Sequence, residues 1–171
     1  MSFVLRCHPM LVQRTLCCLP FAVLLGAAPA PASLDPLRFF EGRTESQSTV
    51  KVIMKKPYLA RSIGQGKISA DGSLRLVQQV LDEGQAPKQR QWLVRRASGD
   101  GFTASMTEAV GPVAIDRVGN AYRFRFRMKG NLSVEQWMKP LPGGTAAQMT
   151  AKVRKMGVTV ASSQGMIRKV S

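Results

Sequence analysis

Apolar and polar side chains alternate along most of the chain after residue 32, in short runs that glycine-containing turns separate. In the clearest run, AYRFRFRM at 121–128, aromatic residues or methionine alternate with basic residues. Because successive side chains of a β-strand point to opposite faces, this run predicts a strand with one apolar face and one cationic face. Further runs of this kind at 49–56, 73–81 and 89–97 predict strands as well.

The turns recur at intervals of roughly eight to twelve residues, and no long stretch has the periodicity of an amphipathic helix. The clearest turn signals are Asp71-Gly72 and Gly130-Asn131. This spacing predicts an all-β domain of about eight to ten strands, preceded by a short helical turn within 33–42. We expect an antiparallel up-and-down β-barrel of the lipocalin-like kind, because closure removes exposed strand edges. A single domain is expected over 33–171.

The N-terminal segment has a different pattern. Two arginines, Arg6 and Arg14, are followed by an apolar run over 15–28 and then by small residues up to Ala32. This is the layout of a secretory signal peptide, so we expect residues 1–32 to be cleaved near Ala32 and the protein to be periplasmic. The apolar run is too short for a comfortable membrane span.

Cleavage at that point would remove most reactive side chains. All three cysteines and the single histidine, His8, lie within residues 1–32. The exported chain would then hold no disulfide, no thiol nucleophile and no imidazole, which excludes Cys–His and Ser–His–Asp catalysis and zinc held by His or Cys. We therefore expect no enzymatic activity, no metal and no cofactor.

The chain carries 25 basic and 10 acidic residues, a formal net charge of +15. In an exported protein, the polyanions available to such a surface are anionic phospholipid and lipopolysaccharide rather than nucleic acid. We expect a monomer that contacts such a membrane surface and also binds an apolar small molecule. The alternative is that the basic residues only keep a β-protein soluble and prevent edge-to-edge association.

Two sets of candidate residues follow from the alternation. The inner face of the 121–128 strand, together with the two tryptophans, is the candidate wall of a ligand cavity, because aromatic residues and methionine adapt to an acyl chain. Its outer face is the candidate docking surface for an anionic membrane. The cavity set is Tyr122, Phe124, Phe126, Met128, Trp92 and Trp137; the docking set is Arg123, Arg125, Arg127 and Lys129.

Several short motifs occur in order along the chain: FFEG, QRQW, GNAYRF, EQWM and VRKMG. Together they resemble an uncharacterised proteobacterial family of exported, often lipid-anchored proteins of lipocalin-like size. The resemblance implies a compact antiparallel barrel, a location in the cell envelope and a link to membrane lipids, and it implies no catalytic residues. The matching positions are Phe39, Phe40, Gly42, Arg90, Trp92, Gly119, Asn120, Ala121, Trp137, Met138, Lys155 and Gly157.

The sequence leaves three functional hypotheses open. The favoured one is a periplasmic module that binds a lipid or another apolar anion and docks on anionic membrane. The second is an envelope structural or interaction protein whose barrel is filled by side chains. The third is a histidine-free hydrolase or isomerase acting on lipid, which would use a carboxylate pair such as Asp82 and Glu83 with Glu108 or Asp116, or a Ser–Lys arrangement.

Overall fold

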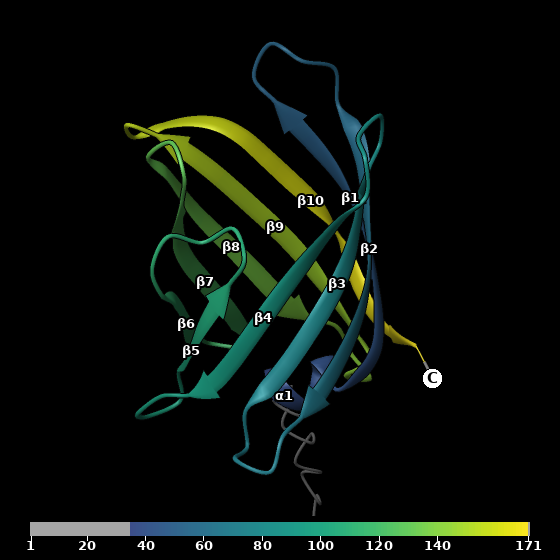
Figure 1. Cartoon of the computed structure of the whole chain (residues 1–171), viewed down its shortest axis with the longest axis vertical. Helices are drawn as coiled ribbons and strands as arrows, with labels where there is room; N and C mark the ends of the chain where they lie inside the picture. Colours follow the sequence, from purple (N-terminus) through teal and green to yellow (C-terminus); the bar gives the residue numbers. More distant parts are fainter. Residues whose placement is uncertain (1–34, 171) are drawn as a thin grey trace, which may run out of the picture. The chain divides into compact units, whose positions relative to one another are not determined.

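The computed structural model describes residues 35–170, which form one short helix and ten β-strands (Figure 1). The helix precedes all of the strands in the chain. The elements are α1 (Pro36–Phe40), β1 (Gly42–Val52), β2 (Tyr58–Ile68), β3 (Leu74–Asp82), β4 (Lys88–Arg96), β5 (Phe102–Met106), β6 (Val113–Val118), β7 (Ala121–Met128), β8 (Leu132–Pro140), β9 (Ala146–Lys155) and β10 (Val158–Val170).

The strands close into an antiparallel barrel in which each strand pairs with its neighbours in sequence. Closure is made by β1 and β10, whose register runs from Arg43 opposite Val170 to Val52 opposite Ala161. Every strand of the described barrel therefore pairs with a strand on each side, although β4, β5 and β7 are paired over only part of their length on one side. The prediction of an up-and-down, lipocalin-like barrel with a short preceding helix is confirmed.

Alternation of side chains sets which residues face the interior. Along β3, Leu74, Leu76, Gln78 and Val80 are buried, and the residues between them are exposed. β7 follows the same rule at its start, where Tyr122 and Phe124 are buried. Successive residues along these strands therefore point alternately into the lumen of the barrel and to its outer surface.

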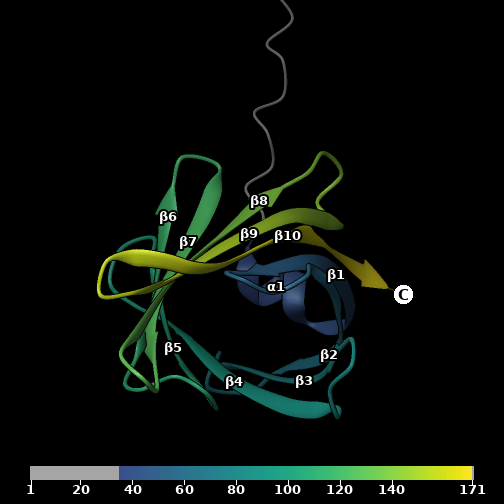
Figure 2. The same ribbon diagram turned by 90° about the horizontal axis from the view of Figure 1, so that it is seen from above.

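The helix α1 closes one end of the barrel. Figure 2, which looks along the barrel, shows α1 inside the ring of strands, beside β1. Asp35 caps its N-terminus by accepting a hydrogen bond from the Leu37 amide at 3.0 Å. Leu37 and Phe39 are each only 3% exposed, so the helix plugs this end with two apolar side chains.

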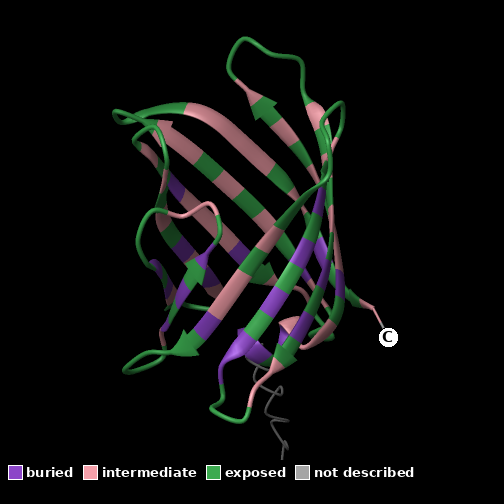
Figure 3. Cartoon of the chain, viewed as in Figure 1, coloured by how far each residue is buried: buried purple, intermediate pink, exposed green. Residues whose placement is uncertain are grey.

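The apolar core lies mainly beside this plug. Figure 3 shows the buried positions concentrated toward the α1 end, with half-buried and exposed positions toward the opposite end. The core includes Leu74, Ile115, Met138 and Ile167, each 2% exposed or less. The barrel is therefore packed at one end and less filled toward the other.

No helix in the described region is both long and apolar enough to cross a membrane. The predicted signal peptide, its cleavage near Ala32, and the cysteines and histidine within it all lie outside the described residues.

Candidate ligand cavity

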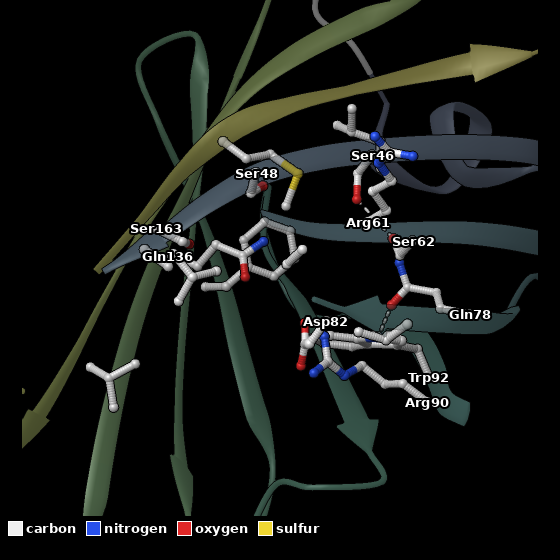
Figure 4. Close-up of a pocket in the computed structure, with 18 of the residues that line it drawn as sticks. Ser46, Ser48, Arg61, Ser62, Gln78, Asp82, Arg90, Trp92, Gln136 and Ser163 are labelled. Carbon is white, nitrogen blue, oxygen red and sulfur yellow. Dashed lines mark hydrogen bonds between the residues drawn. The ribbon is translucent and has the colours of Figure 1, made fainter. Parts of the chain in front are cut away.

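A cavity of about 360 Å³ occupies the interior of the barrel (Figure 4). It extends from Phe40, in the α1 plug, to Tyr58, Asp82 and Lys88 near the opposite end. The strand ends that carry these last three residues form what we call the mouth of the barrel, the end opposite α1. The cavity is partly open to solvent rather than sealed.

Small side chains on three neighbouring strands leave this space unfilled. β2, β1 and β10 lie side by side in the barrel, and their inward positions along the cavity are mostly serine or alanine. Protein interiors are usually packed as tightly as crystals of small molecules. A wall of such short side chains therefore leaves a space only where no larger side chain from the opposite wall fills it. This small-residue wall consists of Ser46, Ser48, Ala60, Ser62, Ala161 and Ser163.

The wall also presents hydroxyl groups to the cavity. The hydroxyls of Ser46 and Ser62 lie 2.8 Å apart, across the β1–β2 register, and satisfy each other. Ser163 of β10 lies opposite Val50 of β1, one inward position from Ser48. Figure 4 shows these serines with Gln136 and Gln78 around the same space, so the wall combines polar groups with a small apolar surface.

Large apolar side chains build the floor of the cavity and the rest of its wall. Trp92 of β4 is held in place because its indole Nε1 donates to Oε1 of the buried Gln78 at 2.9 Å. The Trp92 ring also packs edge-to-face against Phe126 at 6.4 Å between centroids. The remaining apolar lining includes Leu74, Leu76, Val94, Phe124, Met128, Met149 and Ile167, with Phe40 at the base.

Polarity increases toward the mouth. Along β4 the inward residues run Val94, Trp92, Arg90 and Lys88, from the α1 end toward the mouth. The Lys88 ammonium lies 2.8 Å from the carboxylate of Asp82. The six steps along the strand from Val94 to Lys88 cover about 20 Å and pass from an apolar floor to a charged rim.

Arg90 forms the strongest ion pair of the rim. Its Nε and Nη2 donate three hydrogen bonds of 2.8–3.0 Å to the Glu108 carboxylate. Both side chains are about one-quarter exposed, so the pair is only partly screened by water. Among the described residues, no hydrogen bond involves Nη1 of Arg90, a residue that lines the cavity.

Tyr58 adds a neutral donor beside these charges. Burial raises the pKa of its phenol above 10.0, and the nearby negative charge of Asp82 raises it further, against smaller opposing effects of Lys88 and of a hydrogen bond with Gln85. The hydroxyl therefore stays protonated at neutral pH. It presents a donor and an acceptor near the charged rim.

Two of the candidate carboxylates are paired with cations. Asp82 is bonded to Lys88 and Glu108 to Arg90, so each faces a cation rather than another acid. No cluster of three or more potential metal ligands occurs among residues 35–170. The arrangement provides binding surfaces: an apolar floor, a hydroxyl-bearing wall and a charged rim.

The structure divides five of the six predicted cavity residues into three groups. Trp92, Phe124 and Met128 line the cavity. Phe126 is half-buried and packs on Trp92. Tyr122 lies in the packed core near the α1 end, 6.1 Å from the ring of Phe102, and its burial raises its pKa above 10.0.

Trp137 does not line the cavity, which corrects the prediction made for it. It lies opposite Arg123 in the β7–β8 register, and the residues facing inward on β8 are its neighbours Gln136 and Met138. On the outer face the Arg123 guanidinium stacks over the indole at 5.7 Å, and Nε1 of Trp137 donates to Glu135 at 3.4 Å. The indole shields part of an arginine instead of contacting a ligand.

The predicted docking residues on β7 point outward but are partly neutralised. Arg123 and Arg125 both pair with Asp116 of β6, at 3.5 Å and 2.8 Å. Arg127 and Lys129 are exposed toward the mouth. The four cations therefore do not form one uniform free patch.

Two features of the site were missed by the sequence analysis: the small-residue wall and the Arg90–Glu108 pair. The wall has a signal in hindsight, since small residues alternate with other residues over 60–66 of β2 and at Ser46 and Ser48 of β1. The ion pair had no comparable signal, because its two members are 18 residues apart and meet only through the β4–β5 pairing.

Fold and cavity together define a small lipocalin-like barrel. No protein-family model matches the chain, and no curated protein sequence matches it. Among solved structures, the chain is similar to that titled an S-type phycobiliprotein lyase, CPES, from Guillardia theta. The TM-score is 0.59 and the identity 10%, over 79% of this chain and 91% of that one. A likeness at this identity shows the shared fold.

Proposed function

We propose that this protein is a non-enzymatic binding protein of the cell envelope that holds a lipid, or another apolar molecule with an acidic group, in the lumen of its barrel. The observation that carries the proposal is the cavity of about 360 Å³ between the small-residue wall and the Trp92–Phe124 side. This volume lies within the range of small-molecule sites. A barrel that served only as a scaffold would gain stability by filling that space.

The polarity gradient supports an amphipathic ligand with its apolar part toward α1. The apolar part would contact Leu76, Trp92 and Phe124, and methionines beside them can adapt to an irregular chain. An acidic group would lie at the rim, where Nη1 of Arg90 and the hydroxyl of Tyr58 can donate to it. The layout of residues 1–32, with its apolar run and small residues before Ser33, supports export to the envelope.

The likeness to a phycobiliprotein lyase is a likeness of fold, and the proposal takes no activity from it. A phycobiliprotein lyase acts on phycobiliproteins, and only the barrel is shared at 10% identity. The cavity, rather than that activity, motivates the proposal. The alternative of an interaction protein with a filled barrel is less favoured because the lumen is not filled.

A paired substitution tests occupancy of the cavity. Ala151 lines the cavity from β9, whereas Ala114 of β6 is exposed on the outside of the barrel. We expect Ala151→Phe to weaken binding of a fluorescent fatty-acid analogue at least ~10-fold, because the ring enters the ligand space, and Ala114→Phe to leave it unchanged. Equal affinities in both variants and the native protein would refute lumenal binding.

A second comparison tests the acidic group. The double variant Arg90→Gln with Glu108→Gln removes both charges of the rim pair, so that neither is left buried without its partner. We expect about a 10-fold loss of affinity for a long-chain fatty acid and little change for the matching fatty alcohol. Equal losses for acid and alcohol would contradict a role of Arg90 in recognising the acid.

A further inference from the structure

Exposed apolar side chains are concentrated in two loops at the mouth of the barrel. The β1–β2 loop carries Ile53 and Met54, which are 58% and 99% exposed. The β9–β10 turn carries Met156 and is followed by Val158, which are 84% and 63% exposed. Figure 1 shows both loops at the end opposite α1, with the β1–β2 loop projecting beyond the strands.

The backbone of these loops does not explain the methionines. Met54 and Met156 have φ angles of 59° and 50°, in the left-handed region that a side chain disfavours. Glycine or asparagine is the residue that such a conformation favours, and in the β7–β8 turn it is adopted by Gly130 and Asn131. A long apolar side chain at a strained and fully exposed tip therefore points to a role in contact with something apolar.

Lysines surround the same tips. Lys55 and Lys56 follow Met54, Lys155 precedes Met156, and Lys129 lies in the adjacent β7–β8 turn. These three loops are consecutive around the mouth, because β1, β10, β9 and β8 are neighbours in the barrel. None of these four lysines has a salt bridge within the described residues.

We propose that this half of the rim docks the mouth of the barrel on an anionic phospholipid bilayer. We call it the mouth patch: Ile53, Met54, Lys55, Lys56, Lys129, Lys155, Met156 and Val158. The apolar tips would enter the boundary between headgroups and acyl chains, while the lysines lie at the level of the phosphates. Acids of the rim, such as Glu83 and Glu108, belong to the other two mouth loops.

Charge favours an anionic bilayer over a second copy of the chain as the partner of the mouth patch. A second copy of the chain would bring the same lysines and be repelled, whereas an anionic bilayer offers both opposite charge and apolar depth. The outer face of β7 is a weaker candidate, since Asp116 already pairs with Arg123 and Arg125. Docking through the mouth would also let a lumenal ligand pass between bilayer and barrel without crossing water; this consequence alone rests on the proposed function.

Vesicle co-sedimentation tests the apolar part of the mouth patch. The chain is expressed with its own N-terminal segment, and its mass is measured to show which form of the chain is tested. It is then mixed with vesicles of phosphatidylcholine containing roughly one-third phosphatidylglycerol. We expect Met54→Glu with Met156→Glu to weaken binding at least ~10-fold. The control is Met166→Glu, a residue 51% exposed on the outer face of β10 away from the mouth, which should bind as the native protein does.

Charge variants test the lysines in the same assay. Lys55→Glu with Lys56→Glu is compared with Lys67→Glu and Lys139→Glu, two exposed positions near the α1 end. The mouth pair should lose at least ~10-fold and the control pair much less, although each changes the net charge equally. Two results would overturn the proposal: native protein whose vesicle affinity does not depend on phosphatidylglycerol, or control variants that lose as much vesicle affinity as the mouth variants.

Ligand binding in solution separates this inference from the proposed function. The mouth-patch variants should keep native affinity for the fatty-acid analogue, and Ala151→Phe should keep native affinity for vesicles, because the two sets of residues do not overlap. Loss of vesicle binding in Ala151→Phe would show that docking depends on the lumen and would overturn a separate mouth patch. Normal ligand binding without any vesicle binding would refute docking alone.

Discussion

Replacing Gly66 by alanine should displace the α1 plug. Gly66 faces inward on β2, and a Cβ at this position would overlap the carbonyl oxygen of Phe40 at the end of α1. The overlap is far inside the 3.4 Å at which ordinary van der Waals contact begins, and its partner is backbone rather than a flexible side-chain end. The helix must therefore move away from β2 to admit one methyl group.

The expected cost follows from packing at the plug. Forcing one methylene-sized group into a well-packed site costs about 1–3 kcal/mol, and the reduced freedom of the unfolded chain returns about 0.4–1 kcal/mol. We expect Gly66→Ala to lower the free energy of unfolding by about 1–2 kcal/mol. Gly101→Ala is the control, because its Cβ would meet only the Ile115 carbonyl oxygen at 3.3 Å, and it should change stability by less than about 0.5 kcal/mol.

Urea denaturation followed by tryptophan fluorescence measures both variants. With a slope of about 2 kcal/mol/M, Gly66→Ala should lower the midpoint by about 0.5–1 M without changing the slope. A double-mutant cycle with Phe39 identifies the plug as the cause. Phe39→Ala should lower the free energy of unfolding by about 3–5 kcal/mol in the native protein, and by at least ~1 kcal/mol less in the Gly66→Ala variant. A native midpoint for Gly66→Ala, or strict additivity with Phe39→Ala, would refute the reasoning.

Three further predictions use the same denaturation assay. Trp92→Phe removes the indole donor to a buried glutamine amide and should cost about 1–2 kcal/mol; an unchanged midpoint would contradict this. Glu108→Gln removes the charge paired with Arg90 and should cost about 1 kcal/mol at low salt and less at high salt, whereas a salt-independent loss would show that the charge is not the cause. Asp71 accepts hydrogen bonds from the hydroxyl and amide of Ser73, which lower its pKa below 3.8. The contribution of Asp71 to the free energy of unfolding is therefore present above that pH and is lost as the pH falls through the folded-state pKa. Asp71→Asn should therefore lower the midpoint above about pH 5 and progressively less in more acidic solution, and a constant difference across that range would contradict the assignment.

The barrel itself could be predicted from the alternation, because a half-buried strand must place every second residue inside. The start of β1 could not be predicted in the same way. Over Gly42–Ser48 the inward residues are Thr44, Ser46 and Ser48, so no apolar alternation marks the strand. The absence of bulk at these positions, which concealed the strand, is also what keeps the cavity open.

The site could be predicted only in part. Phe124, Met128 and Trp92 follow from strand alternation, because each lies in a run whose inward face is apolar. The prediction for Trp137 is wrong because it assumes that an aromatic residue faces the lumen, whereas the inward residues here are its two neighbours, Gln136 and Met138. Its actual partner, Arg123, comes from the preceding strand, and only the β7–β8 register identifies it.

Native mass spectrometry of the protein purified from a bacterial periplasm, with organic extraction in parallel, tests lumenal binding most directly. Lumenal binding predicts a discrete added mass that extraction releases as a fatty acid, a phospholipid or another apolar acid, and that Ala151→Phe no longer retains. A protein that carries no added mass, and that acquires none when incubated with a periplasmic lipid extract, would contradict it and favour a barrel that acts through its surface.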